Sequence, residues 1–254
     1  MASGLPIALL IIYITVSLPT IYIAFKHGVR HAAIIGWGFL FIFCTLRIIS
    51  SAIESKDSTS TGAALIASIG LSPLLASVCG VLHEARAYLI PKSRRPADVT
   101  FLVFFHFLVT TAIALVAAGA SKLDNTTLPP DQMKRSHNLV KAGMVMLLLS
   151  WISLALLVFN TFYQSLAQRA SKVGGSGGTK LLLAVTFSIP FLGIRVLERL
   201  IYFFTENQAL NPVTGSLGLR VGLEVIEELI VTFMLLVAGI MTRNIKSAPT
   251  EAIY

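Results

Sequence analysis

Seven long apolar stretches constrain this chain more than any other feature of its sequence. Each has roughly the 20 residues that an α-helix needs to cross the hydrocarbon core of a membrane. We place them at about 5–25, 32–53, 63–82, 99–119, 139–163, 181–204 and 217–241. Together they leave only short connections within the 254 residues. The sequence therefore predicts an all-α, seven-transmembrane-helix bundle that forms a single polytopic domain over residues 1–254.

Composition excludes the other broad classes of protein. Only 13% of the residues are charged, which is about half the share in soluble domains. The net charge of +8 does not indicate a nucleic-acid partner, because the basic residues lie mostly in short loops between the apolar stretches. The two cysteines, Cys44 and Cys79, both lie inside apolar stretches. Two such residues form neither a metal site nor a disulfide framework, and we expect no metal and no cofactor.

The distribution of lysine and arginine predicts the orientation. Cytoplasmic loops of membrane proteins are enriched in these residues. If the N-terminus lies outside, the inner segments hold eleven of them and the outer segments hold four. The first stretch lacks a basic segment before it and a cleavage site before Lys26, so we expect a retained span. These features predict an external N-terminus and a cytosolic C-terminus, in the endoplasmic reticulum or the plasma membrane.

One tripeptide agrees with this orientation. Asn125-Thr126-Thr127 has the pattern of an acceptor for N-glycosylation. It lies in the connection between the fourth and fifth stretches, which the charge distribution places outside. Asn125 is therefore a candidate glycosylation site.

Several ionisable residues interrupt the apolar stretches, where each needs a partner, water or a function. The ionisable residues that we consider as candidate site residues are Arg47, Arg195, Glu198, Arg220, Glu224, Glu227 and Glu228. With a rise of about 1.5 Å per residue, most of them fall at one depth in the outer half of the bilayer. Arg220, Glu224 and Glu228 follow i, i+4 spacing and form one helical stripe, with Glu227 beside it. We predict that these groups point into the bundle and face one another.

Two interpretations of these charges remain open. In the first, they form a structural ion-pair network that fixes helix packing. In the second, they line a polar cavity that opens to the outer side. Three glutamates within five residues exceed what one or two arginines neutralise, and such crowding favours a protonated carboxyl that can donate its proton. In that case the candidate catalytic residues are Glu224, Glu227 and Glu228, and the candidate ligand-binding residues are Arg47, Arg195, Glu198 and Arg220.

Three further patterns predict local structure. The segment His83-Glu84-Ala85-Arg86 begins like a zinc-binding H-E-x-x-H motif, but Ala87 replaces the second histidine, so we expect interfacial side chains that reach toward water. Gly36-Trp37-Gly38 is predicted to allow close approach of a neighbouring helix. Pro73 and Pro190 are predicted to kink the third and sixth spans.

Short motifs resemble one known family. They are TLRI around Arg47, GLSPLL from Gly70 to Leu75, and IPFLGIR from Ile189 to Arg195. With the glutamates of the last span, they resemble a family of uncharacterised fungal seven-helix integral membrane proteins. The resemblance implies a fungal source and a link to secondary metabolism, and it supplies no catalytic residues. Fungal membrane-bound terpene cyclases are similar in length and span number, but Arg47 stands where their early acidic motif lies.

Three functions are consistent with these features. The first is a membrane-embedded cyclase or isomerase of an apolar small molecule, such as a polyprenyl or polyketide intermediate. The second is a receptor or transporter that binds such a molecule without changing it. The third is an accessory protein that organises pathway enzymes. The expected partners are therefore membrane lipids, an apolar small molecule and, in the third case, pathway enzymes.

Overall fold

The computed structural model describes residues 4–27, 33–90, 95–123, 129–169 and 176–244. These residues form α1 (Gly4–His27), α2 (Ala33–Lys56), α3 (Thr61–Ile69), α4 (Leu71–Leu89), α5 (Arg95–Leu123), α6 (Pro130–Arg169), α7 (Ser176–Thr205), η2 (Gln208–Leu210), α8 (Leu217–Arg220), the π-helical η3 (Val221–Val225) and α9 (Ile226–Thr242). Within these ranges, seven helical segments are long and apolar enough to cross a membrane. The prediction of a multi-pass, all-α membrane protein is confirmed.

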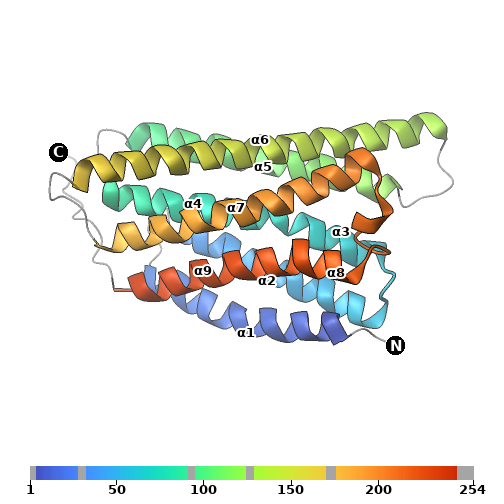
Figure 1. Ribbon diagram of the computed structural model, residues 1–254, viewed down its shortest axis with the longest axis horizontal. Coiled ribbons are helices and arrows are strands. Elements are labelled where there is room, and N and C mark those ends of the chain that lie inside the picture. Colours follow the sequence, from blue (N-terminus) through green and yellow to red (C-terminus); the bar gives the residue numbers. More distant parts are fainter. Residues whose placement is uncertain (1–3, 28–32, 91–94, 124–128, 170–175, 245–254) are drawn as a thin grey trace.

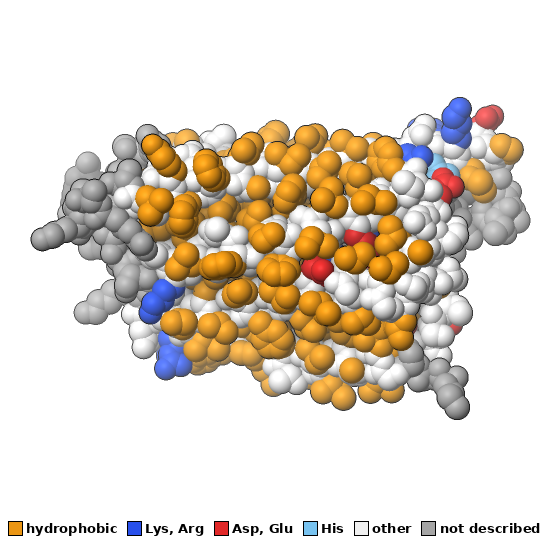
Figure 2. Space-filling view, in the orientation of Figure 1, with side chains coloured by type: hydrophobic (Ala, Val, Ile, Leu, Met, Phe, Trp, Pro, Cys, Tyr) orange, Lys and Arg blue, Asp and Glu red, His pale blue; other side chains and the backbone are white. Residues whose placement is uncertain are grey.

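The seven spans alternate in direction along one elongated bundle (Figure 1). Because their number is odd, the first residue of α1 and the last residue of α9 lie at opposite ends. We name these two ends the Gly4 end and the Thr242 end. The side chains that face outward are mostly apolar, and Figure 2 shows them as a broad hydrophobic band along the flank of the bundle. Such a band matches the hydrocarbon of a bilayer.

Helix α4 forms the centre of the bundle. Of its 19 residues, 16 are buried, and it packs against α2, α5, α6 and α7. Its small side chains make this possible, since they let neighbouring backbones approach. A methyl group added at Gly80 would lie 2.5 Å from the Cα of Gly36 on α2, so these two helices touch through glycine. The prediction of close approach is confirmed at Gly36 but is wrong at Gly38, where an added methyl would meet nothing within 4 Å.

Two of the seven spans are irregular. The third is interrupted at Gly70, which separates α3 from α4 three residues before Pro73. Proline lacks the N–H that would bond the carbonyl of Ile69, which explains a break at this place. The sixth span, in contrast, continues as one helix through Pro190. The last span contains a π turn, Val221–Val225, and this type of turn often occurs at functional sites.

Candidate functional site

Charged side chains from α2 and the last span meet inside the bundle. The Nε of Arg47 donates a hydrogen bond to Glu228 Oε2 (2.5 Å), and its Nη2 donates one to Glu224 Oε1 (3.0 Å). All three side chains are at most 4% exposed. A buried arginine between two carboxylates of another helix cross-links those helices. For Arg47, Glu224 and Glu228, the prediction that these groups point into the bundle and face one another is confirmed.

Helix α7 contributes two more arginines to the same place. Arg195 is fully buried: its Nε donates to Glu228 Oε1 (2.9 Å), its Nη1 donates to Glu198 Oε2 (2.5 Å), and its Nη2 lies 3.0 Å from Glu224 Oε1. Arg199 lies one turn further along α7 and donates from Nη2 to Glu224 Oε2 (2.8 Å). Its Nε lies 3.5 Å from Glu198 Oε2. The last span is thereby tied to both α2 and α7.

The charges in this group balance. We define the charged cluster as Arg47, Arg195, Arg199, Glu198, Glu224 and Glu228. Three arginines match three glutamates within this cluster, and the acidic excess that the sequence predicts resides in Glu227, which lies outside it. Arg199 lies four residues from Arg195, on the same helical face, but it was not among the candidate site residues.

Arg220 lies nearer the Gly4 end and has a different partner. Both of its terminal nitrogens donate to Glu54 of α2, each over 2.6 Å. This bidentate pair is less buried than the charged cluster, since the side chains are 18% and 11% exposed. The expected stripe of Arg220, Glu224 and Glu228 is therefore divided between two sets of contacts. Glu54 was not among the predicted site residues.

Two other ionisable residues remain outside the charged cluster. Glu227 follows the π turn, but among the described ion pairs none includes it, and its Oε2 has no hydrogen-bond partner. The other is Lys141 of α6, which also interrupts an apolar stretch. Its Nζ lies 5.6 Å from the centre of the Phe204 ring, in a cation–π contact.

A second polar group lies near the Thr242 end. We name it the histidine cluster; its members are His27 of α1, Trp37 of α2, Glu84 of α4 and the Gly239 carbonyl of α9. His27 Nδ1 lies 2.6 Å from Glu84 Oε1, and the Trp37 Nε1 donates to Glu84 Oε2 (3.0 Å). His27 Nε2 lies 3.0 Å from the Gly239 carbonyl, which only accepts, so this nitrogen carries a proton.

The prediction that Glu84 and Arg86 reach toward water at the membrane surface is wrong. Both residues are buried, with exposures of 5% and 4%. Arg86 donates from Nη2 to Asp98 Oδ1 of α5 (2.6 Å) and from Nη1 to the Thr161 hydroxyl of α6 (2.5 Å). These partners lie far away in the sequence, and no local pattern around His83 reveals them.

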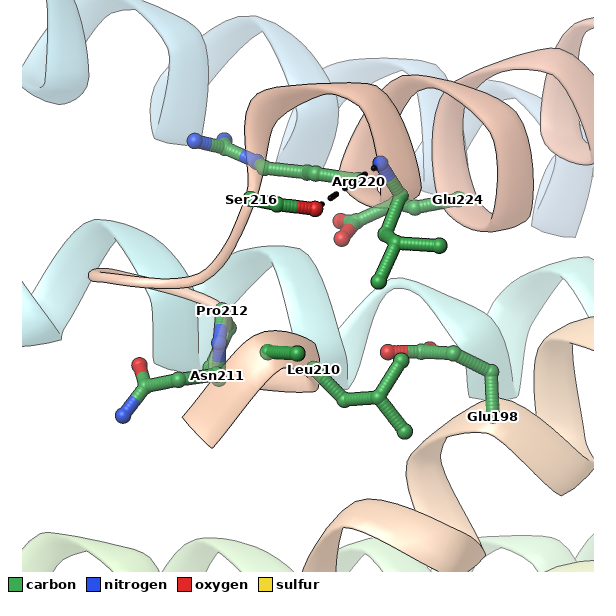
Figure 3. A pocket seen from close by; sticks show the side chains of 9 residues that line it. Glu198, Leu210, Asn211, Pro212, Ser216, Arg220 and Glu224 are labelled. Carbon is green, nitrogen blue, oxygen red and sulfur yellow. Dashed lines mark hydrogen bonds between the residues drawn. The ribbon is translucent and has the colours of Figure 1, made fainter. Parts of the chain in front are cut away.

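A small pocket separates the charged cluster from the loop that follows α7. Its volume is about 10 Å³, which is room for one water molecule. Figure 3 shows the carboxyl groups of Glu198 and Glu224 on one side and Asn211 and Pro212 on the other. This small pocket has no room for a ligand larger than water.

A much larger, open-sided cavity, which we name the chamber, lies on the other side of this loop. Its volume is about 640 Å³, and Asn211 and Pro212 belong to the walls of both the chamber and the small pocket. The remaining walls come from α3, the end of α5 and the end of α7. The lining residues are Thr59, Thr61, Gly62, Ala64, Leu65, Ser68, Val116, Ala120, Ser121, Tyr202, Phe203, Asn211, Pro212, Val213 and Thr214. None of these is charged, and six of them carry hydroxyl groups.

One wall of the chamber is fixed by a local turn between α2 and α3. The Thr59 backbone N–H and hydroxyl both donate to Asp57 Oδ1, at 3.0 and 2.7 Å. These hydrogen bonds favour the ionised form and lower the pKa of the Asp57 carboxyl. Ser60 then caps α3 by accepting a hydrogen bond from the Ala63 N–H.

The described residues contain no group of three or more His, Cys, Asp or Glu side chains placed to hold a metal ion. Cys44 and Cys79 are free thiols buried among apolar side chains. Asn125, the candidate glycosylation site, lies outside the described residues.

The fold and its internal ion pairs define a seven-helix, multi-pass membrane protein. Within that class, the chain belongs to the family described as Domain of unknown function (DUF7702), whose model matches residues 1–245. Comparisons with curated proteins and with solved structures gave no match. The match over nearly the whole chain agrees with the resemblance to an uncharacterised family.

Proposed function

We propose that this protein binds an uncharged, largely apolar small molecule in the chamber at the Gly4 end. The chamber itself is the observation that carries this proposal. Its volume of about 640 Å³ lies within the usual range for small-molecule sites, and its walls combine apolar surface with a few polar groups. The uncharged lining favours a neutral ligand, because a charged ligand would lose its hydration without gaining an ionic partner.

The polar groups of the lining favour a ligand that has hydroxyl or carbonyl oxygens. The hydroxyl groups of Ser68 and Ser121 lie on α3 and α5, and that of Tyr202 lies on α7. A hydroxyl group both donates and accepts hydrogen bonds, so these residues suit either type of oxygen. Prenyl or polyketide intermediates of fungal secondary metabolism have this chemistry, and we place the ligand in that class on the resemblance stated above.

The proposed orientation places the chamber outside the cytosol. If the N-terminus is external, the Gly4 end faces the lumen or the extracellular space, and so does the loop that contains Asn125. Single cysteines at position 125 and after Arg243 are then expected to react with impermeant reagents from opposite sides of sealed vesicles. Reaction from the same side would contradict the orientation and would place the chamber at the cytosolic face.

A matched pair of substitutions on α5 tests the binding proposal. Ala120 lines the chamber, whereas Ala118 is exposed on the outside of the same helix. Ala120→Trp is expected to fill the chamber, and Ala118→Trp adds the same side chain without entering it. Each full-length protein is purified in mild detergent, and the small molecules that copurify are extracted and compared by mass spectrometry. We expect a compound that accompanies the parent and Ala118→Trp and is lost from Ala120→Trp.

Equal recovery of that compound from both tryptophan variants would contradict binding in the chamber. If no small molecule copurifies with the folded parent protein, the membrane from which the protein was isolated contains no ligand for the chamber, and this result also contradicts the proposal. Thermal unfolding of both variants serves as the control, since loss of the compound counts only when the variant remains folded.

Acid-initiated cyclisation or isomerisation is the second candidate function. It assigns the acid to Glu224, Glu227 or Glu228 and ligand contacts to Arg47, Arg195, Glu198 and Arg220. The observation in its favour is the small pocket, which places Glu198 and Glu224 beside the chamber wall. However, Glu224 and Glu228 each already accept hydrogen bonds from two arginines, so their carboxylate oxygens are engaged within the charged cluster and not free to contact a substrate. Binding without catalysis is therefore the function that the geometry supports best.

A further inference from the structure

Glu227 is a buried carboxyl group that the charged cluster leaves out. Its side chain is only 6% exposed, and its Oε2 has no hydrogen-bond partner. Among the described ion pairs, none includes this residue, although it lies next to Glu228 in the sequence. An unpartnered carboxyl oxygen inside a protein is costly and calls for a physical explanation.

The position of Glu227 in the span makes the cost larger. It lies ten residues after Leu217, where the last span begins, and is therefore about 15 Å below the Gly4 end of that span. This depth is close to the middle of the hydrocarbon core. Figure 2 shows acidic atoms at the surface of the hydrophobic flank, between α7 and the helix that runs from α8 into α9. At this depth, the 6% of Glu227 that remains exposed meets lipid rather than water.

The charges around Glu227 do not neutralise it. It interacts electrostatically with Arg195 and Glu198 of α7 and with Glu228 of its own helix. Arg195 is the one cation in this set, and it already contacts three carboxylates. If Glu227 were ionised, the charged cluster and Glu227 together would carry one uncompensated negative charge. A single positive charge or a single proton at Glu227 restores neutrality.

The local backbone keeps Glu227 apart from the other two glutamates. The π turn Val221–Val225 ends just before α9, and the N–H of Ile226 bonds the Val221 carbonyl across it. Glu224 lies within this turn and Glu228 follows it, and both contact the arginines, whereas Glu227 is in none of the described ion pairs. Such turns are conformationally costly and occur frequently at functional sites.

We propose that Glu227 is a proton-binding site that faces the bilayer between α7 and α9. In the resting protein, one proton occupies the carboxyl group and makes the region around the charged cluster electrically neutral. Release of that proton leaves a negative charge beside Arg195 and creates competition with Glu198 and Glu228 for this arginine. The site goes beyond the proposed function, because it does not depend on a ligand in the chamber.

Reaction with dicyclohexylcarbodiimide tests this proposal on the full-length protein in lipid vesicles. This apolar reagent enters the bilayer and reacts with protonated carboxyl groups. The carboxyl oxygen adds to the central carbon of the reagent and the acid proton moves to nitrogen; the acyl group then migrates to nitrogen, and nothing is released. We expect Glu227 to gain the mass of one reagent molecule, as located by peptide mass spectrometry. The adduct is expected at mildly acidic pH and is expected to be lost at alkaline pH.

Two controls define the site. A water-soluble carbodiimide is expected to modify Glu206, whose side chain is 65% exposed in the loop after α7, and to leave Glu227 unmodified. The variant Glu227→Gln keeps the size of the side chain and is expected to lose the adduct. Because the adduct is located in the parent protein, the test remains valid even if this variant does not fold.

Three results would overturn the proposal. The first is a folded parent protein in which Glu227 never reacts with the apolar reagent at any pH. The second is equal reaction of Glu227 with both reagents, which would mean that the carboxyl group faces water. The third is a pair of effects of dodecylamine: it protects Glu227 from the apolar reagent, and it raises the thermal stability of the parent protein more than that of Glu227→Gln. Together these effects would identify a site for an amphiphilic amine instead of a proton.

Discussion

The charged cluster joins helices about halfway along the bundle, whereas the histidine cluster joins them near the Thr242 end, and the two differ in redundancy. In the charged cluster, every arginine contacts at least two carboxylates, and Arg195 contacts three. In the histidine cluster, one carboxylate serves two donors, and each donor depends on it alone for that contact. We infer that charge balance controls stability at the charged cluster, whereas the histidine cluster depends on the single acceptor Glu84.

The largest expected effect follows removal of Arg195. Arg195→Leu leaves Arg47 and Arg199 to face three glutamates, so that one buried negative charge is uncompensated. Breaking a buried ion pair in this way costs about 3–5 kcal/mol. We expect loss of folded protein, measured by the yield of monodisperse protein in detergent and by its thermal unfolding temperature.

A second substitution distinguishes charge balance from the loss of contacts. Arg195→Leu combined with Glu228→Leu removes one charge of each sign, and Arg47 and Arg199 keep Glu224 as a partner. We expect the double variant to recover most of the folded yield. If the double variant is as unstable as the single one, individual contacts rather than charge balance stabilise the charged cluster.

The sequence predicts the helices of these regions better than it predicts their contacts. The seven spans follow from stretch length, and the shared depth of Arg47 and the glutamates follows from the constant rise of a helix. The partners do not follow, because they depend on how the helices are rotated and packed. Glu84 and His27 are 57 residues apart, and neither has a neighbouring residue that identifies the other.

The sequence did not predict the chamber either, because the chamber also depends on how the helices pack. Its walls come from α3, α5, α7 and the loop after α7, and its lining residues are ordinary hydroxyl and apolar side chains. A cavity arises where packed helices leave space, which is a property of the assembled bundle. The π turn also depends on tertiary contacts, although the three nearby glutamates correctly marked that part of the last span as unusual.

A smaller effect is expected from substitutions of Glu84 in the histidine cluster. Glu84→Leu removes the acceptor for both His27 and Trp37 and leaves buried donors unsatisfied, at about 1–3 kcal/mol each. Glu84→Gln keeps one carbonyl oxygen and is expected to lose roughly half as much stability. Thermal unfolding in detergent measures this order. If the two variants were equally unstable, the negative charge rather than the hydrogen bonds would be the important property of Glu84.

The smallest expected effect tests whether helix spacing supports the histidine cluster. Gly36→Ala places a methyl group 2.8 Å from the Val81 nitrogen of α4, so α2 has to move outward. Overpacking of this kind costs about 1–3 kcal/mol, and the movement also separates Trp37 from Glu84. Gly38→Ala is the matched control, because its methyl group meets nothing within 4 Å and the change favours helix formation. We expect Gly36→Ala to lower the unfolding temperature and to shift the Trp37 fluorescence, whereas Gly38→Ala changes neither. A Trp37 signal that stays unchanged in a destabilised Gly36→Ala protein would show that the histidine cluster is held by its own hydrogen bonds, independently of the contact between α2 and α4.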